Sequence, residues 1–162
     1  MLISSSRGQS LAEVIVASAV GILVVSALVF AIIFSLRNAN FSKNQAQATK
    51  LAQEGMEKVR SIRDRDGVVI FTHSGGTTAK FTDLWSVRLR DSCDPCYFTF
   101  VSNNLNGGVI TSYETLTNGM LRQVQMSDDI NFDKEKTISV VVKWVDFAGS
   151  HESRLKTILR KL

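Results

Sequence analysis

Proline and N-terminal charge are the two features of which this sequence of 162 residues has least. Pro95 is its only proline, which argues against a Pro-rich linker or stalk. Glu13 is the only charged residue between Arg7 and Arg37, so nearly all of the 19 basic and 15 acidic residues lie in residues 38–162. An apolar fraction of 44% and a charged fraction of 21% are ordinary for a globular protein and exclude disorder as the main state.

The charged part of the chain is long enough to bury a modest core of its own. The net charge of +4 mildly favours anionic partners. Basic residues are interleaved with acidic ones, however, and they form no obvious nucleic-acid patch. Nucleic acid is therefore a disfavoured partner, although the sequence leaves it open.

Residues 14–36 are an uninterrupted run without a single charge. At about 1.5 Å per residue, a helix of this length spans roughly 35 Å, enough for a hydrocarbon core of about 30 Å. A cleaved secretory signal has a shorter apolar region of about 7–15 residues, and a buried soluble helix would keep a polar face, which this run lacks. The run therefore predicts a membrane-spanning helix.

Glu13 lies immediately before this run. A carboxylate inserted into the bilayer costs on the order of 3 kcal/mol unless it finds a partner, so ionisable residues in such segments are functional candidates. The alternative is a glutamate that stays at headgroup depth. Taken alone, the residue does not distinguish the two interpretations.

The residues before Glu13 form a short polar leader that ends in Arg7-Gly8, followed by Gln9-Ser10-Leu11-Ala12. This pattern resembles the class III signal of type IV pilins and type II secretion pseudopilins, in which a glycine is followed by four residues, a glutamate and an apolar span. The resemblance implies that a prepilin peptidase cuts between Gly8 and Gln9 and that Gln9 is then N-methylated. It also implies that Glu13, fifth in the mature chain, sets the assembly register by pairing with a neighbour's N-terminal amine. Members of this family most often begin with Phe or Met, whereas this chain would begin with Gln9.

Small residues recur at four-residue spacing in the run, where they would let helix backbones approach closely. They are Ala17, Gly21, Ala27, Ala31 and Ser35. Ordinary membrane-helix composition explains this pattern as well as a packing face does.

The helical pattern continues beyond the run, over residues 37–66. Apolar residues recur there at three- and four-residue steps and predict one buried stripe. Glu54 and Lys58 form a favourable i,i+4 pair, and Gly67 is a plausible stop signal. The stripe consists of Ala48, Leu51, Ala52, Met56, Val59 and Ile62.

After residue 67 the pattern changes to short strands and turns. We expect strands at 68–72, 85–89, 97–101, 109–113, 121–126 and 137–146, with turns at 74–76, 103–108 and 148–150. Residues 151–162 are expected to return as a strand, with a short helix as the competing interpretation. The stretch 138–159 also resembles the terminal hairpin of V-class minor pilins and of type II secretion minor pseudopilin I.

Cys93 and Cys96 are the only cysteines. In an extracytoplasmic head they are candidates for a small local disulfide. A redox Cys-x-x-Cys would need a helix N-terminus, and a zinc site would need two more ligands, whereas the two histidines, His73 and His151, are far apart. The two histidines are interpreted as surface or turn residues.

No catalytic set is recognisable in the sequence. Gly75-Gly76 and Gly107-Gly108 form no phosphate-binding loop, and no serine lies in a G-x-S-x-G motif. The acids at 64, 66, 128 and 129 read as solvated loop residues. We therefore expect no enzyme activity, no catalytic residue, no cofactor and no metal.

Together these observations predict an α+β protein whose long N-terminal helix packs against a small antiparallel sheet. Its expected parts are a leader (1–8), a transmembrane and assembly helix (9–36), an amphipathic continuation (37–66) and a β-rich extracytoplasmic head (67–162). The resemblance implies a structural, minor subunit of a type IV pilus or similar filament. A secretion or DNA-uptake pseudopilin is one alternative, and a membrane-anchored binding or redox module is another.

The resemblance also implies the partners and the location. The partners would be other pilin subunits, a prepilin peptidase, an inner-membrane assembly platform and, before assembly, membrane lipid. The chain would cross the cytoplasmic membrane once with its head outside, and would later form part of an extracellular or periplasmic filament.

Overall fold

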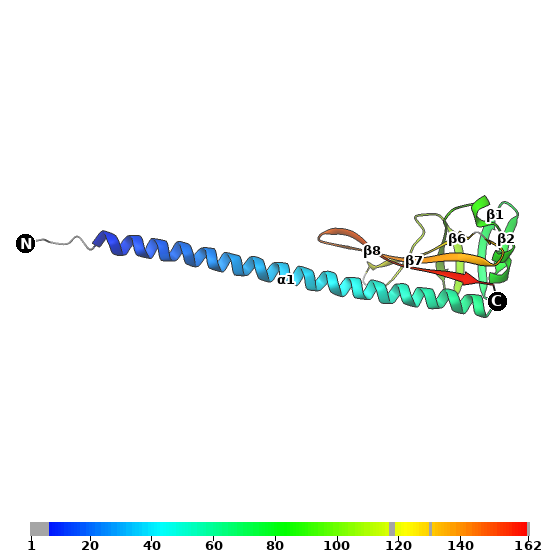
Figure 1. Ribbon diagram of the computed structural model, residues 1–162, viewed down its shortest axis with the longest axis horizontal. Coiled ribbons are helices and arrows are strands. Elements are labelled where there is room, and N and C mark those ends of the chain that lie inside the picture. Colours follow the sequence, from blue (N-terminus) through cyan, green and yellow to red (C-terminus); the bar gives the residue numbers. More distant parts are fainter. Residues whose placement is uncertain (1–6, 117–118, 130, 162) are drawn as a thin grey trace, which may run out of the picture. The chain divides into compact units, whose positions relative to one another are not determined.

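A computed structural model describes residues 7–116, 119–129 and 131–161, with only the backbone described for residues 7–10. The leader residues 1–6 lie outside the described residues. The chain divides into two compact units, Met1–Lys43 and Asn44–Leu162. Helix α1 (Arg7–Asp64) runs through both units, and the second unit adds a β-sheet, so the fold is α+β as the sequence predicts (Figure 1).

In the second unit, the last five turns of α1 pack on the sheet through the expected stripe. Ala48, Ala52, Met56, Val59 and Ile62 are all buried, and Leu51 packs partly against them. Burying such a stripe stabilises a helix far more than local propensity does. Outside the stripe, Lys58 and Glu54 form the predicted ion pair at 3.4 Å between Nζ and Oε1.

The helix ends just before the predicted stop. Asp66 adopts a left-handed conformation with φ of 49°. The Gly67 N–H then donates to the Ile62 carbonyl at 2.7 Å, and the Asp66 N–H donates to Arg63 at 3.1 Å. These two bonds are the Schellman pattern that satisfies the last carbonyls of a helix. The left-handed position therefore falls on Asp66, one residue before the glycine.

Among the described residues, eight strands form one sheet in the order β2-β1-β4-β3-β6-β7-β8, with β5 paired to β6. All neighbours are antiparallel except β1 and β4, which are parallel. The strands are β1 (Val68–His73), β2 (Gly76–Lys80), β3 (Cys96–Val101), β4 (Asn104–Gly108), β5 (Glu114–Thr115), β6 (Leu121–Asp128), β7 (Glu135–Asp146) and β8 (Gly149–Arg160).

Most of the expected strands are confirmed, namely those at 68–72, 97–101, 121–126 and 137–146. Residues 151–160 are also a strand rather than the competing short helix. The turn expected at 148–150 lies earlier, at Phe147 and Ala148, because Gly149 already pairs with Asp146. The Ala148 N–H donates to Asp146 Oδ1 at 2.8 Å in this turn.

The strand expected at 85–89 is wrong. Two 3₁₀-helices, η1 (Phe81–Trp85) and η2 (Leu89–Asp91), take its place. The Asp83 carboxylate accepts the Ala79 and Lys80 N–H groups at 2.9 Å each, which starts the turn and holds the pKa of Asp83 below its ordinary value. Trp85, Val87 and Leu89 are nevertheless buried. The alternating sequence pattern therefore identified the buried side chains correctly but predicted the wrong backbone conformation.

The turn expected at 103–108 is also wrong beyond its first residue, because residues 104–108 form β4, which pairs with β3. The reversal is instead a tight turn at Ser102, whose φ is 57°. Gly107, which suggested a turn, instead allows the side chain of Phe71 to pack close to the backbone of β4. A Cβ on Gly107 would lie 2.8 Å from Phe71 Cδ2.

The strand expected at 109–113 is likewise absent from the described chain. Ser112 N–H donates to the Val109 carbonyl at 2.8 Å and closes a turn. The carbonyls of Ile110 and Ser112 accept the Gln123 side-chain amide at 3.0 and 2.7 Å. The segment therefore covers Gln123 on one sheet face rather than joining the sheet.

Gly55 lies where α1 comes closest to the sheet. A Cβ at this position would meet Val140 Cγ1 at 2.9 Å and Arg122 Cδ at 3.0 Å. Both neighbours are buried side chains of β6 and β7, so neither can move into solvent. The glycine therefore sets the helix–sheet distance.

Replacing Gly55 by leucine is expected to lower the free energy of unfolding by about 1–3 kcal/mol, the usual cost of overpacking. Chemical denaturation of the detergent-solubilised chain, followed by tryptophan fluorescence, measures the change. Gly21→Leu is the matched control, because nothing lies within 4 Å of a Cβ at that helical glycine. Equal stability of the two variants would contradict the close approach.

Candidate functional site

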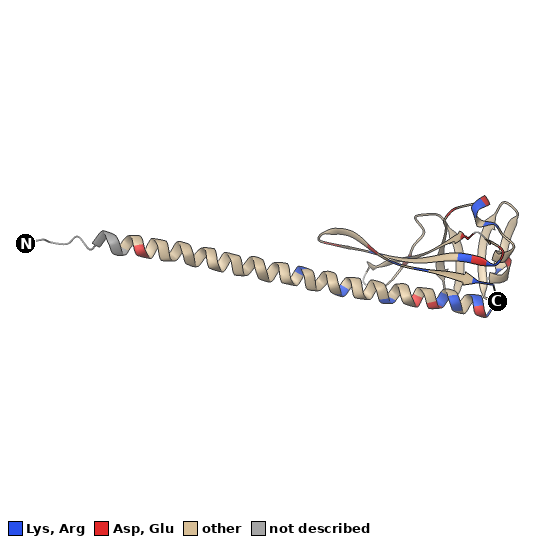
Figure 2. Cartoon of the chain, viewed as in Figure 1, with Lys and Arg blue, Asp and Glu red and all other residues tan. Residues whose placement is uncertain are grey.

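The first unit presents the apolar helix predicted from the sequence. Every residue from 11 to 43 is exposed within its unit, including all the large apolar side chains. The most apolar stretch of 18 residues in this helix has a mean hydropathy of 2.8, and none of its residues is buried. Figure 2 shows no charged position along it between Glu13 and the next basic residue, Arg37. A helix of this composition is compatible with a single membrane span.

The hydroxyl groups within this helix are satisfied by its own backbone. Ser18 Oγ donates to the Ile15 carbonyl at 2.8 Å, and Ser26 Oγ donates to the Ile22 carbonyl at 2.7 Å. Such back-bonding hides a polar group that would otherwise be costly in lipid. These serines therefore do not count against a membrane environment.

Glu13 is helical and exposed, two residues into the part of α1 whose side chains are described. No side chain that the structure describes forms an ion pair with it. Gly8 and Gln9, the predicted cleavage and methylation positions, lie in the first turn of α1, but Gln9's side chain is outside the described residues. Cleavage, methylation and the register role of Glu13 stay predictions.

The small residues at four-residue spacing lie on an open helix surface. Ala17, Gly21, Ala27, Ala31 and Ser35 are all exposed. A Cβ at Gly21 would meet nothing within 4 Å. A neighbouring helix could therefore approach at these positions without displacing any group of its own chain.

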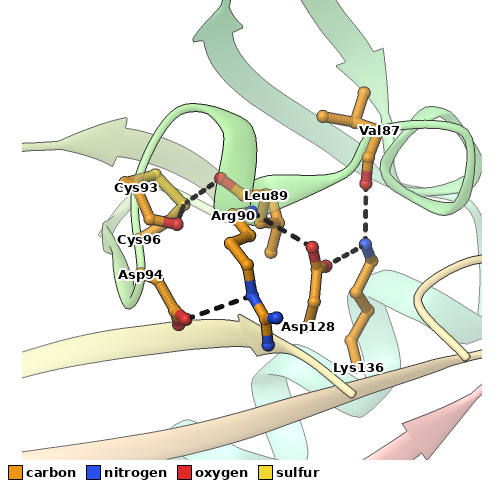
Figure 3. The surroundings of a disulfide bond; sticks show 8 residues. All are labelled: Val87, Leu89, Arg90, Cys93, Asp94, Cys96, Asp128 and Lys136. Carbon is orange, nitrogen blue, oxygen red and sulfur yellow. Dashed lines mark hydrogen bonds and ion pairs between the residues drawn. A yellow bond between two sulfur atoms is a disulfide. The ribbon is translucent and has the colours of Figure 1, made fainter. Parts of the chain in front are cut away.

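Cys93 and Cys96 form the predicted local disulfide, with their Cα atoms 4.9 Å apart (Figure 3). Cys93 lies in the loop after η2, and Cys96 is the first residue of β3. A thioredoxin-like motif requires its cysteines at the N-terminus of a helix, and this pair precedes a strand instead. Cys96 is fully buried, so the bridge anchors this loop to the core.

A buried ion pair next to the disulfide was not predicted. Lys136 Nζ lies 2.6 Å from Asp128 Oδ1, with 1% and 3% of the two side chains exposed. Lys136 Nζ also donates to the Val87 carbonyl at 2.7 Å, and the Arg90 N–H donates to Asp128 Oδ2 at 3.1 Å (Figure 3). Burial lowers the pKa of Lys136, against the opposing effect of Asp128. The interpretation of Asp128 as a solvated loop acid is thus wrong.

Arg122 is a second buried charge, and it ties α1 to the sheet. Its Nε donates to Glu114 Oε2 at 2.8 Å, and its Nη1 donates to the Leu51 carbonyl at 3.1 Å. Its guanidinium also lies over the Phe100 ring at 5.0 Å. Every contact is internal, which assigns Arg122 to the fold rather than to chemistry on a ligand.

The two histidines lie in different hairpins. His73 Nδ1 accepts the Gly75 N–H at 3.0 Å. His151 Nε2 lies 2.9 Å from Asp146 Oδ1, and its ring stacks on Trp144 at 5.5 Å. Burial raises the pKa of Asp146, but the Ala148 N–H and His151 outweigh it, and the net pKa is lowered. Both histidines are half-buried strand residues beside a turn, rather than the surface or turn residues expected.

No group of three or more His, Cys, Asp or Glu residues that could hold a metal ion occurs among the residues described here. No protein-family model, no curated protein and no solved structure matches this chain.

Proposed function

We propose that this chain is a structural, minor subunit of a type IV pilus or a pilus-like filament. It is cut by a prepilin peptidase after Gly8, is held in the membrane by the first half of α1, and is then assembled through that helix. One observation carries the proposal: an exposed apolar helix whose only carboxylate, Glu13, stands five residues after a glycine and at the start of the apolar run.

The energetics of Glu13 support this role. Apolar helices in lipid gain nothing from one vertical register over another, because lipid tails are as apolar as their side chains. An unpaired carboxylate in that environment is costly, and pairing it with a positive group removes most of the cost. Cleavage after Gly8 supplies such a group, the new amine of Gln9 on a neighbouring subunit. A single charge pair thus selects one register and one direction of growth.

The two halves of α1 differ in exposure, which supports one role in the membrane and in assembly for the first half and another in carrying the head for the second half. The half in the first unit keeps its apolar side chains exposed and available to lipid or to other subunits. The half in the second unit buries its stripe under the sheet and carries the head. Other pilin subunits, the peptidase and an inner-membrane assembly platform are the proposed partners. The head then lies outside the cytoplasmic membrane, where a disulfide such as Cys93–Cys96 persists.

The mass of the native protein tests this proposal. The mature chain is expected to begin at Gln9 and to carry one methyl group on its terminal amine. Gly8→Leu is expected to leave the full-length precursor in the membrane, whereas the Gly21→Leu control is processed normally. A native chain that retains Met1, or one cut beyond residue 30, would identify an anchored or secreted module instead.

A further inference from the structure

A polar groove of about 310 Å³ lies on the sheet face that is turned away from α1. Val140 points toward Gly55 of the helix, so its neighbour Ser139 points to the opposite face. Ser139 is directly opposite Gln125 on β6 and Lys156 on β8, and paired residues share a face. Side chains of these three strands line the groove: Gln125, Ser127, Thr137, Ser139, Arg154 and Lys156.

The floor of the groove carries hydroxyl groups that the fold does not use. Ser139 is only 8% exposed, yet its hydroxyl has no hydrogen-bond partner among the described residues. The hydroxyls of Ser127 and Thr137, which are paired across β6 and β7, are likewise unpartnered within the described chain. A hydroxyl that opens onto a groove ordinarily bonds to water or to a bound group, so this floor can hydrogen-bond the hydroxyls of a ligand.

Two cations flank this floor. The Arg154 guanidinium donates to Gln125 Oε1 at 3.2 Å and forms an ion pair with Glu152 Oε1 at 3.3 Å, so Lys156 is the cation of the pair without an acidic partner. Lys156 is exposed and forms no ion pair with any residue that the structure describes. Asp128 also borders the groove, but Lys136 and the Arg90 N–H occupy its two oxygens. The groove therefore offers hydrogen-bond donors and positive charge.

We propose that this groove binds a phosphate ester of a small polyol, such as a glycerol phosphate unit. Lys156 and Arg154 contact the phosphate oxygens through charge-assisted hydrogen bonds. Ser139 and its two hydroxyl neighbours contact the polyol hydroxyls. The groove has room for a polyol beside the phosphate, which a bare phosphate ion would leave unfilled. This binding activity is separate from assembly through α1 and does not depend on it.

Titration of sn-glycerol 3-phosphate into the full chain, solubilised in dodecyl maltoside and followed by ³¹P NMR, tests this proposal. We expect saturable binding that weakens with added salt, because the contacts are ionic. Lys156→Gln is expected to weaken binding about tenfold, the scale of one charge-assisted hydrogen bond. Ser139→Ala is expected to weaken it by a smaller factor. Lys50→Gln, which removes an exposed lysine of α1, is the matched control and leaves the affinity unchanged.

Four comparisons decide whether the site exists and which ligand class it takes. Glycerol alone binding as tightly as glycerol phosphate would overturn the role of the two cations. Inorganic phosphate binding as tightly as glycerol phosphate would overturn the role of the hydroxyl floor. An unchanged affinity of Lys156→Gln, with thermal unfolding like that of the parent chain, would overturn the site itself. A Lys156-dependent response to phosphatidylglycerol in mixed micelles would assign the ligand to a lipid headgroup, and a response to the free ester alone would assign it to a soluble source.

Discussion

Replacing Glu13 by alanine is expected to leave membrane insertion of the chain intact while reducing its incorporation into filaments by at least about a hundredfold. An unpaired charge in the bilayer costs about 3 kcal/mol, and under the proposed function pairing with a neighbour's amine relieves that cost and selects the register. The measurement compares the amount of the subunit in the membrane fraction with the amount in sheared filaments.

Glu57→Ala is the matched control for this experiment. Glu57 is also a glutamate of α1, but it is exposed in the second unit, where it pairs with Arg60 at 2.6 Å. Surface pairs of this kind contribute little, so incorporation of this variant should match that of the parent chain. Filaments that contain Glu13→Ala at normal levels would remove the register argument.

Replacing Lys136 by methionine is expected to lower the free energy of unfolding by about 3–5 kcal/mol, the cost of leaving one partner of a buried ion pair uncompensated. Asp128 would keep only the Arg90 N–H as a donor, in a site where 3% of its side chain is exposed. Denaturant unfolding of the detergent-solubilised chain measures the change, with Trp85 and Trp144 as buried reporters.

The double variant Lys136→Met, Asp128→Leu separates the cost of an orphaned charge from the value of the pair. Apolar replacement of both partners is often close to neutral, so most of the lost stability should return. Lys134→Met, an exposed lysine two residues away, is the surface control and should unfold like the parent chain. If the double variant is no more stable than the single variant, the loss comes from another cause than the unpaired carboxylate.

Local periodicity was sufficient to predict the elements that bury one face. The stripe from Ala48 to Ile62 has helical spacing, and the alternation around Val140 has strand spacing, so both faces could be read without knowing the partner. The end of α1 was found to within two residues, because the glycine stop signal at Gly67 is also local to the chain. The residues that form these patterns are close neighbours in the sequence, so the patterns can be recognised without the tertiary structure.

The errors occurred where tertiary pairing overrides a local signal. Asn and Gly in β4 suggest a turn, but pairing with β3 and β1 holds the segment extended. The pairing of Asp128 with Lys136 spans a turn whose register the sequence does not specify, so the carboxylate looked solvated. In the candidate site, Glu13 could be singled out because its cost in lipid is intrinsic to the residue. The polar groove could not, since it needs the register of three strands.

The parallel pairing of β1 with β4 has a consequence for how the head folds. The hairpins β1–β2 and β3–β4 each close over a short turn, whereas Val69 of β1 and Leu105 of β4, which pair in parallel, lie far apart in the sequence. Contacts between residues so distant in sequence must overcome loop-closure entropy before they are rewarded. The head should therefore form its hairpins early and join β1 to β4 late.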